Sequence, residues 1–141
     1  MRSRIQFFHE GLVFNIKEKP LVRNWIKAII RNENRLTGEI TFIFCSNEYL
    51  LHLNQVFLKK NTFTDIITFP STDSKDIIAG DIFISIPMVE SNATEFKQPF
   101  QMELLRVMAH GILHLIGYKD KTKTEKKEMT KKEDFYISLI L

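Results

Sequence analysis

The sequence is poor in cysteine, and Cys45 is its single one. One thiol forms no internal disulfide, and in the apolar run from Ile40 to Cys45 we expect it to be buried as a small hydrophobic residue. Glycine and proline are also scarce, with five and four residues among 141, and the chain contains no repeat, low-complexity tract or linker. With 44% hydrophobic residues, this composition predicts one globular domain that spans residues 1–141.

Long apolar runs are absent as well. No stretch approaches the roughly 18 consecutive apolar residues that a membrane helix needs. His9 and Glu10 interrupt the apolar residues that follow Arg2 and Arg4, so no signal-peptide core forms. We therefore expect a cytoplasmic protein with no membrane partner. The net charge of +3 and the pI near 9.0 are compatible with a polyanionic ligand but do not name one.

Helix and strand patterns alternate along the chain, which predicts an α/β (α+β) fold. Periodic apolar residues and capping residues predict helices from about Pro20 to Asn34, from Ser46 to Phe57, from Met88 to Phe96, from Pro99 to Ile116, and from Thr122 onward. β-Branched and aromatic runs predict strands over Glu39 to Cys45, Thr64 to Phe69, and Ile78 to Ile86. We expect a small mixed sheet of about four strands, packed with helices, and a buried central helix that ends at Gly117.

The segment from His110 to Asp120 has the spacing of a metal site. His110 and His114 lie one helical turn apart, so both rings can reach a common ion. Gly117 ends the helix and lets the chain fold back, which brings Asp120 towards the same point. Three protein ligands with an open fourth position are typical of catalytic zinc sites, although Mn, Fe, Co or Ni stay open. We expect His110, His114 and Asp120 to bind one Zn²⁺ and to be the catalytic residues of a metal-dependent hydrolase.

Two alternatives accompany this interpretation. Asp120 could instead be an exposed acid that pairs with Lys119 or Lys121. The same spacing also occurs in metzincin peptidases, in which a glutamate directly after the first histidine is the general base. In this chain that position is Gly111, which cannot take a proton from a water molecule, so the sequence argues against proteolysis.

Together these motifs resemble the YbeY family of bacterial rRNA maturation factors, whose signature is HGxLHLxGYDH. The chain reads HGILHLIGYKD from His110 to Asp120. Further matches are LN at Leu53-Asn54, TDIITFP from Thr64 to Pro70 where the family has TDVLSFP, GDI from Gly80 to Ile82, and the family's later E and M at Glu125 and Met129. The resemblance covers residues 40 to 136.

The resemblance implies a metal-dependent endoribonuclease that acts on single-stranded RNA. It implies a role in rRNA processing at the 3′ end of the small-subunit RNA and in ribosome quality control, with rRNA and the small ribosomal subunit as partners. An alternative of a different class is a ribosome-assembly factor that binds RNA through its basic surface, with a metal that only stabilises the last helical turn. The basic and acidic residues of the final helix, Glu133 among them, are expected to form a solvated face.

The chain departs from the family pattern at three positions. Asp120 stands where the family has its third histidine ligand, Lys119 where it has an aspartate, and Leu58 where it has an arginine that is expected to contact phosphate. Lys59 or Lys60 could replace that arginine as a point charge, although neither has its bidentate fork. Thr64 and Asp65 are further candidates for RNA binding, with a turn or capping role as the alternative.

Overall fold

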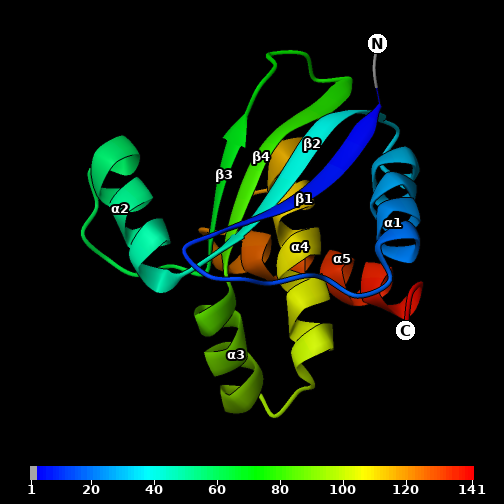
Figure 1. Ribbon diagram of the computed structural model, residues 1–141. Coiled ribbons are helices and arrows are strands. Elements are labelled where there is room, and N and C mark those ends of the chain that lie inside the picture. Colours follow the sequence, from blue (N-terminus) through cyan, green and yellow to red (C-terminus); the bar gives the residue numbers. More distant parts are fainter. Residues whose placement is uncertain (1–2) are drawn as a thin grey trace.

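A computed structural model describes residues 3–141, and its centre is a four-stranded mixed sheet (Figure 1). The strands lie in the order β1-β2-β4-β3, with bounds Arg4–Glu10 for β1, Leu36–Cys45 for β2, Ile77–Ser85 for β4 and Ile66–Pro70 for β3. β2 is parallel to both β1 and β4, whereas β3 is antiparallel to β4. The predicted α/β class with a small mixed sheet is confirmed.

The sequence patterns named three of these strands and missed β1. Within β1 the side chain of Ile5 is buried, while Gln6 and Phe7 are partly buried and Phe8 is half exposed. Ile5 is the one buried residue of this strand, and its apolar and polar residues do not alternate cleanly, so its strand signal is weak. The strand therefore depends on pairing with residues more than thirty positions away, as in the match of Ile5 to Ile40.

Helices lie where the sequence predicts them. Their bounds are Lys19–Asn32 for α1, Asn47–Leu58 for α2, Ile86–Glu95 for α3, Phe100–Ile116 for α4 and Lys123–Ser138 for α5. The Ser46 hydroxyl accepts a hydrogen bond from the Tyr49 amide and caps α2, and Thr122 and Glu125 form the predicted capping box of α5. Gly117, with a φ of 124°, ends α4 as expected.

Both faces of the sheet are covered by helices. α1, α4 and α5 share the larger core with one face, to which Phe42, Ile82 and Ile84 contribute. α2 packs on the opposite face in a smaller cluster that includes Cys45 and Ile67. In Figure 1, α2 lies on the side of edge strand β3, and α1 lies on the side of the opposite edge strand, β1. The site-bearing helix α4 is therefore fixed in the larger core, where nine of its residues are buried.

Cys45 is fully buried, as expected. Burial, together with the nearby charge of Glu10, raises the pKa of its thiol to about 12. The thiol therefore stays protonated and unreactive at neutral pH.

Within residues 3–141, no helix is long and apolar enough to cross a membrane. The cytoplasmic location stays a prediction.

Gly111 allows α4 to pack closely against the sheet. A Cβ atom at this position would lie 2.8 Å from Ile66 Cδ1 and 3.0 Å from Ile82 Cγ2, which is closer than side-chain packing permits. The position occupied by the peptidase glutamate in metzincins thus faces the sheet in this protein. A larger side chain at this position would require the side chains of Ile66 and Ile82 to shift.

We predict that Gly111→Val lowers the free energy of unfolding by about 1–3 kcal/mol, because the added carbons overpack the contact between α4 and the sheet. Gln101→Val is the matched control, since it adds the same β-branched residue to the first turns of α4 at a partly exposed site. Chemical denaturation of both variants measures the difference. Equal losses of stability in the two variants would contradict the close packing at Gly111.

Candidate metal centre

The structure brings His110, His114 and Asp120 together. Asp120 Oδ2 lies 3.2 Å from His110 Nε2 and 3.5 Å from His114 Nε2. One ligand atom from each of the three residues lies within 4.8 Å of the other two. α4 presents both rings, and the turn after Gly117 returns Asp120 to them. Among the described residues, the ion pairs of Asp120 are therefore with the histidines and not with the neighbouring lysines.

The other ring nitrogen of His110 is held by a buried carboxylate. His110 Nδ1 lies 2.6 Å from Glu133 Oε2, and Glu133 is only 6% exposed. Arg106 Nη1 donates to the second oxygen of Glu133 at 3.1 Å, so this carboxylate is fixed in place. A carboxylate paired with a guanidinium accepts a hydrogen bond, so Nδ1 carries the proton. Nε2 is then the nitrogen of His110 that can ligate a cation.

His114 has the same orientation by a different means. Its Nδ1 lies 3.0 Å from the carbonyl oxygen of Tyr118, which can only accept a hydrogen bond. Nε2 of His114 is therefore also free to ligate. Two imidazole nitrogens and a carboxylate oxygen face one another, and protons or a cation must lie between these three electron-pair donors. The set suits a borderline divalent cation such as Zn²⁺, with the histidines oriented from behind as in many metal sites.

The electrostatics of the centre favour positive charge. Burial alone would lower the pKa of His110, but the hydrogen bond and charge of Glu133 outweigh burial, and the charges of Asp120 and Asp65 add to them. The pKa of His110 is therefore raised above its ordinary value. The same carboxylates would stabilise a divalent cation between the rings.

His110 and Asp120 lie where two clefts meet, and His114 lines the larger of the two. One cleft, of about 460 Å³, is lined by Leu58, Lys60, Phe63 and Thr64 as well as by the centre. The other, of about 340 Å³, extends along Asn92, Phe96, Glu103 and Arg106. Asp65, Ile66, His110 and Asp120 line both clefts. A cation in the centre would thus be accessible to a substrate from two sides.

The structure separates the predicted RNA-binding residues. Lys60, Thr64 and Asp65 line the larger cleft, whereas Lys59 is not among its lining residues. Lys59 ends α2 in a left-handed conformation with a φ of 56°. The turn itself therefore decides which of the two lysines reaches the cleft. Leu58, at the position of the family arginine, lines the cleft and is 43% exposed.

Thr64 and Asp65 also have local structural contacts. The Thr64 hydroxyl donates to the carbonyl of Ile66, and the Asp65 carbonyl accepts from the Ser85 amide at 2.9 Å. The Asp65 carboxylate accepts from Asn92 Nδ2 at 3.2 Å, which holds it at the junction of the clefts. Their turn role and their place in the site are therefore compatible.

The expectation that Glu133 belongs to a solvated helix face was wrong. Glu133 follows Met129 by four residues and precedes Tyr136 by three, so it lies on the apolar stripe of α5, and Met129 and Tyr136 are buried. An acidic residue within such a stripe needs a buried partner, which was the available signal. Its partners Arg106 and His110 both lie on α4, more than twenty residues earlier, so the pairing itself could not be read from local sequence.

An α/β fold with a His-His-Asp group open to clefts suits the class of metal-dependent hydrolases. The chain belongs to the YbeY family, because residues 10–140 match the family model described as Endoribonuclease YbeY. Two proteins named Endoribonuclease YbeY are similar to it. The one from Karelsulcia muelleri (strain GWSS) is 44% identical over 94% of this chain and 93% of its own, and the one from Cytophaga hutchinsonii is 46% identical over 96% and 94%.

A solved structure supports the fold. The solution structure of a protein from Thermotoga maritima is similar to this chain with a TM-score of 0.67 and 32% sequence identity, and the match covers 97% of this chain and 89% of that one. The family resemblance inferred from the motifs is therefore confirmed.

We predict that Glu133→Gln weakens Zn²⁺ binding by about 10- to 100-fold, because the amide no longer supplies the charge that orients His110. Asp134→Asn is the matched control, since Asp134 is the next residue and also pairs with Arg106, at 2.7 Å, but is exposed and does not contact His110. Competition with a chelating dye measures both affinities. Unchanged affinity in Glu133→Gln would contradict the role of this carboxylate.

Proposed function

We propose that this protein is a zinc-dependent endoribonuclease that hydrolyses single-stranded RNA. The observation that supports it most is the convergence of His110 Nε2, His114 Nε2 and Asp120 Oδ2 on the wall of the larger cleft. Membership of a family described as endoribonucleases supplies the substrate class. By the same family relationship we propose a cytoplasmic role in rRNA processing at the 3′ end of the small-subunit RNA, in contact with the small ribosomal subunit, and in ribosome quality control.

Each residue of the centre has a distinct task in this proposal. His110, His114 and Asp120 hold the cation, and Glu133 and the Tyr118 carbonyl fix the two rings. A bound Zn²⁺ would activate the attacking water and neutralise charge on the phosphodiester. Asp65, held by Asn92, supplies a further carboxylate at the junction of the clefts, where it can orient the water or accept its proton.

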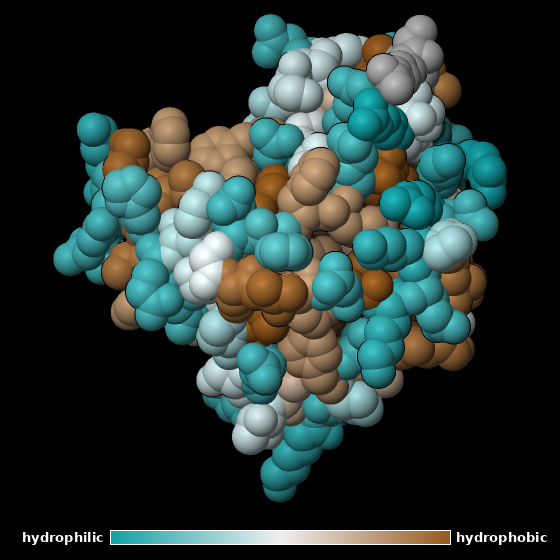
Figure 2. Space-filling model, viewed as in Figure 1, coloured by the Kyte–Doolittle hydropathy of each residue, from teal (hydrophilic) through white to brown (hydrophobic). Residues whose placement is uncertain are grey.

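The larger cleft suits an unpaired nucleotide. Leu58 and Phe63 are 43% and 57% exposed on its wall, and Lys60 lies on the same cleft. An exposed aromatic ring can stack on a base that is not already stacked in a duplex, and a lysine attracts the neighbouring phosphate. Apolar surface is visible at the left of Figure 2, on the side where α2 lies. The last three residues of α2, Val56, Phe57 and Leu58, are exposed, and Leu58 lines the cleft. This wall supports a preference for single strands.

We predict that His114→Ala abolishes both zinc retention and RNA cleavage, because the two remaining protein ligands bind the ion too weakly to retain it. His52→Ala is the control, because His52 is an exposed histidine of α2 outside the lining of either cleft. Metal analysis and cleavage of a fluorescent single-stranded RNA, with and without chelator, test both variants. Cleavage by His114→Ala at the wild-type rate would refute the assignment.

The same assay separates the alternatives. RNA binding without turnover at any divalent metal concentration would identify a non-catalytic assembly factor, which Leu58 favours because the expected arginine is missing from the cleft. Cleavage of casein but not of RNA would identify a divergent peptidase.

We further predict that Lys60→Ala weakens RNA binding and lowers the slope of log affinity against log salt by about 0.7, the value for one phosphate contact on a single strand. Lys75→Ala is the control, since Lys75 is an exposed lysine of the loop between β3 and β4. Titrations of the zinc-loaded protein with a non-cleavable single-stranded RNA analogue at several salt concentrations measure the slopes. Identical slopes for the two variants would exclude Lys60 as the phosphate contact.

A further inference from the structure

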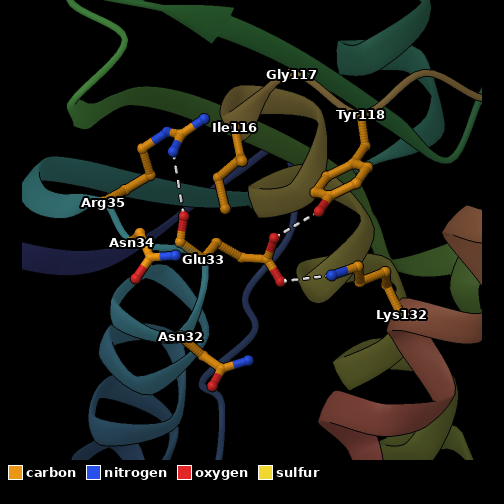
Figure 3. A pocket seen from close by; sticks show the side chains of 8 residues that line it. All are labelled: Asn32, Glu33, Asn34, Arg35, Ile116, Gly117, Tyr118 and Lys132. Atoms are coloured by element: carbon orange, nitrogen blue, oxygen red, sulfur yellow. Dashed lines mark hydrogen bonds and ion pairs between the residues drawn. The ribbon is translucent and has the colours of Figure 1, made fainter.

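A second polar network lies behind the metal centre, around Glu33 at the end of α1 (Figure 3). The Glu33 side chain is only 7% exposed. Its Oε1 accepts a hydrogen bond from the Tyr118 hydroxyl at 2.6 Å, and its Oε2 accepts from Lys132 Nζ at 3.0 Å and from the Tyr136 hydroxyl. The network borders a cleft of about 510 Å³ that is separate from the two clefts at the metal centre.

The network is closed by further contacts between α1 and α5. Asn32 Nδ2 donates to the Tyr136 hydroxyl at 2.9 Å, and Trp25 Nε1 donates to the Tyr136 carbonyl at 2.7 Å. Lys132 Nζ also lies over the Tyr118 ring, 5.2 Å from its centre. Burial alone would raise the pKa of Glu33, but the hydrogen bonds from Tyr118, Tyr136 and Lys132 outweigh it and lower this pKa. Glu33 is therefore an ionised acceptor around which three donors are ordered.

Tyr118 connects this network to the metal centre. Its side chain binds Glu33, and its carbonyl oxygen accepts the hydrogen bond that orients His114. Asp120, the proposed third ligand, follows two residues later. The network therefore contacts the one residue whose backbone both orients a histidine and leads to the third ligand.

The segment between α4 and α5 has few other constraints. The Tyr118 amide donates to the Leu113 carbonyl at 3.0 Å, and the next amide with an assigned partner is that of Lys121, which donates to Glu125 Oε1 at 3.1 Å. Asp120 lies between these two points. The hydrogen bond from the Tyr118 hydroxyl to Glu33 therefore fixes the segment on its N-terminal side, and the capping residue Glu125 fixes it on the other.

The network also contacts the helix that orients the first histidine. Lys132, which binds Glu33, is the neighbour in sequence of Glu133, which binds His110. One buried carboxylate at the end of α1 thus contacts both structural units that hold the rings, the turn after α4 and the middle of α5.

We propose that Glu33 and Tyr118 are positioning residues of the metal centre. They hold its ligands in place without contacting the metal or the substrate. The Glu33 carboxylate holds the Tyr118 phenol and thereby sets the positions of the Tyr118 carbonyl and of Asp120. The inference rests on the proposed function, because it assumes that His110, His114 and Asp120 bind a cation.

The test is Tyr118→Phe in the full chain, which removes the hydroxyl and keeps the ring and the carbonyl. Tyr136→Phe is the matched control, because it removes another hydroxyl donor from the same Glu33 carboxylate but leaves the hydrogen bond of Tyr118 intact. Co²⁺ is the probe, with its affinity measured by competition and its visible absorption spectrum recorded. Thermal unfolding of the metal-free variants measures the purely structural loss.

Tyr118→Phe is expected to bind Co²⁺ about tenfold more weakly than wild type and with an altered spectrum, at the lower end of the range for partners behind a ligand. Tyr136→Phe is expected to lower the unfolding temperature while its affinity stays within about twofold of wild type. If Tyr118→Phe does not fold, Glu33→Gln is measured in its place, because its amide group can no longer accept from both Tyr118 and the donors on α5.

Wild-type affinity and spectrum in Tyr118→Phe would overturn the inference while the proposed function stands. Equal losses of affinity in Tyr118→Phe and Tyr136→Phe would also overturn it, since they would show a general structural effect. A wild-type chain that binds neither Co²⁺ nor Zn²⁺ would overturn the proposed function and this inference together.

Discussion

The candidate metal centre depends on the hydrogen bonds made by the Nδ1 atoms of two imidazole rings. Nδ1 of His110 is held by Glu133 and Nδ1 of His114 by the Tyr118 carbonyl, so both Nε2 atoms are turned towards Asp120. Each of these partners comes from outside α4. The site therefore requires that α5 and the turn after α4 dock correctly on the larger core, and the packing of Gly111 on the sheet sets the depth at which α4 lies.

Charge links metal binding to substrate binding. Asp65, Asp120 and Glu133 lie together around the centre, and Arg106 is already paired with Glu133. Without a cation these carboxylates would repel the phosphates of RNA, although the whole chain has a net charge of +3. A divalent cation would neutralise most of this negative charge. In this account the cation is needed both for the chemistry and for the approach of the phosphodiester, and Lys60 provides positive charge beside it.

The features that could be predicted from the sequence are those that depend on residues close together in the chain. Two histidines one turn apart and a glycine stop depend on helix geometry alone, so the ligand trio could be proposed before the fold was known. Glu133 and Glu33 could not, because their partners lie 23 and 85 or more residues away in the chain. The strand β1 needed its pairing with β2. Lys59 and Lys60 are adjacent residues of the same type, so the sequence alone does not show which one faces the cleft. The left-handed turn at Lys59 distinguishes them.

The proposed function requires that one divalent cation binds to two imidazole nitrogens and a carboxylate oxygen on this chain. X-ray absorption spectroscopy of the zinc-loaded protein measures this directly. We predict one zinc per chain, with two nitrogen ligands at about 2.0–2.1 Å that show imidazole scattering and an oxygen shell at about 2.0–2.2 Å. A spectrum without imidazole scattering, or with sulfur in the first shell, would contradict it.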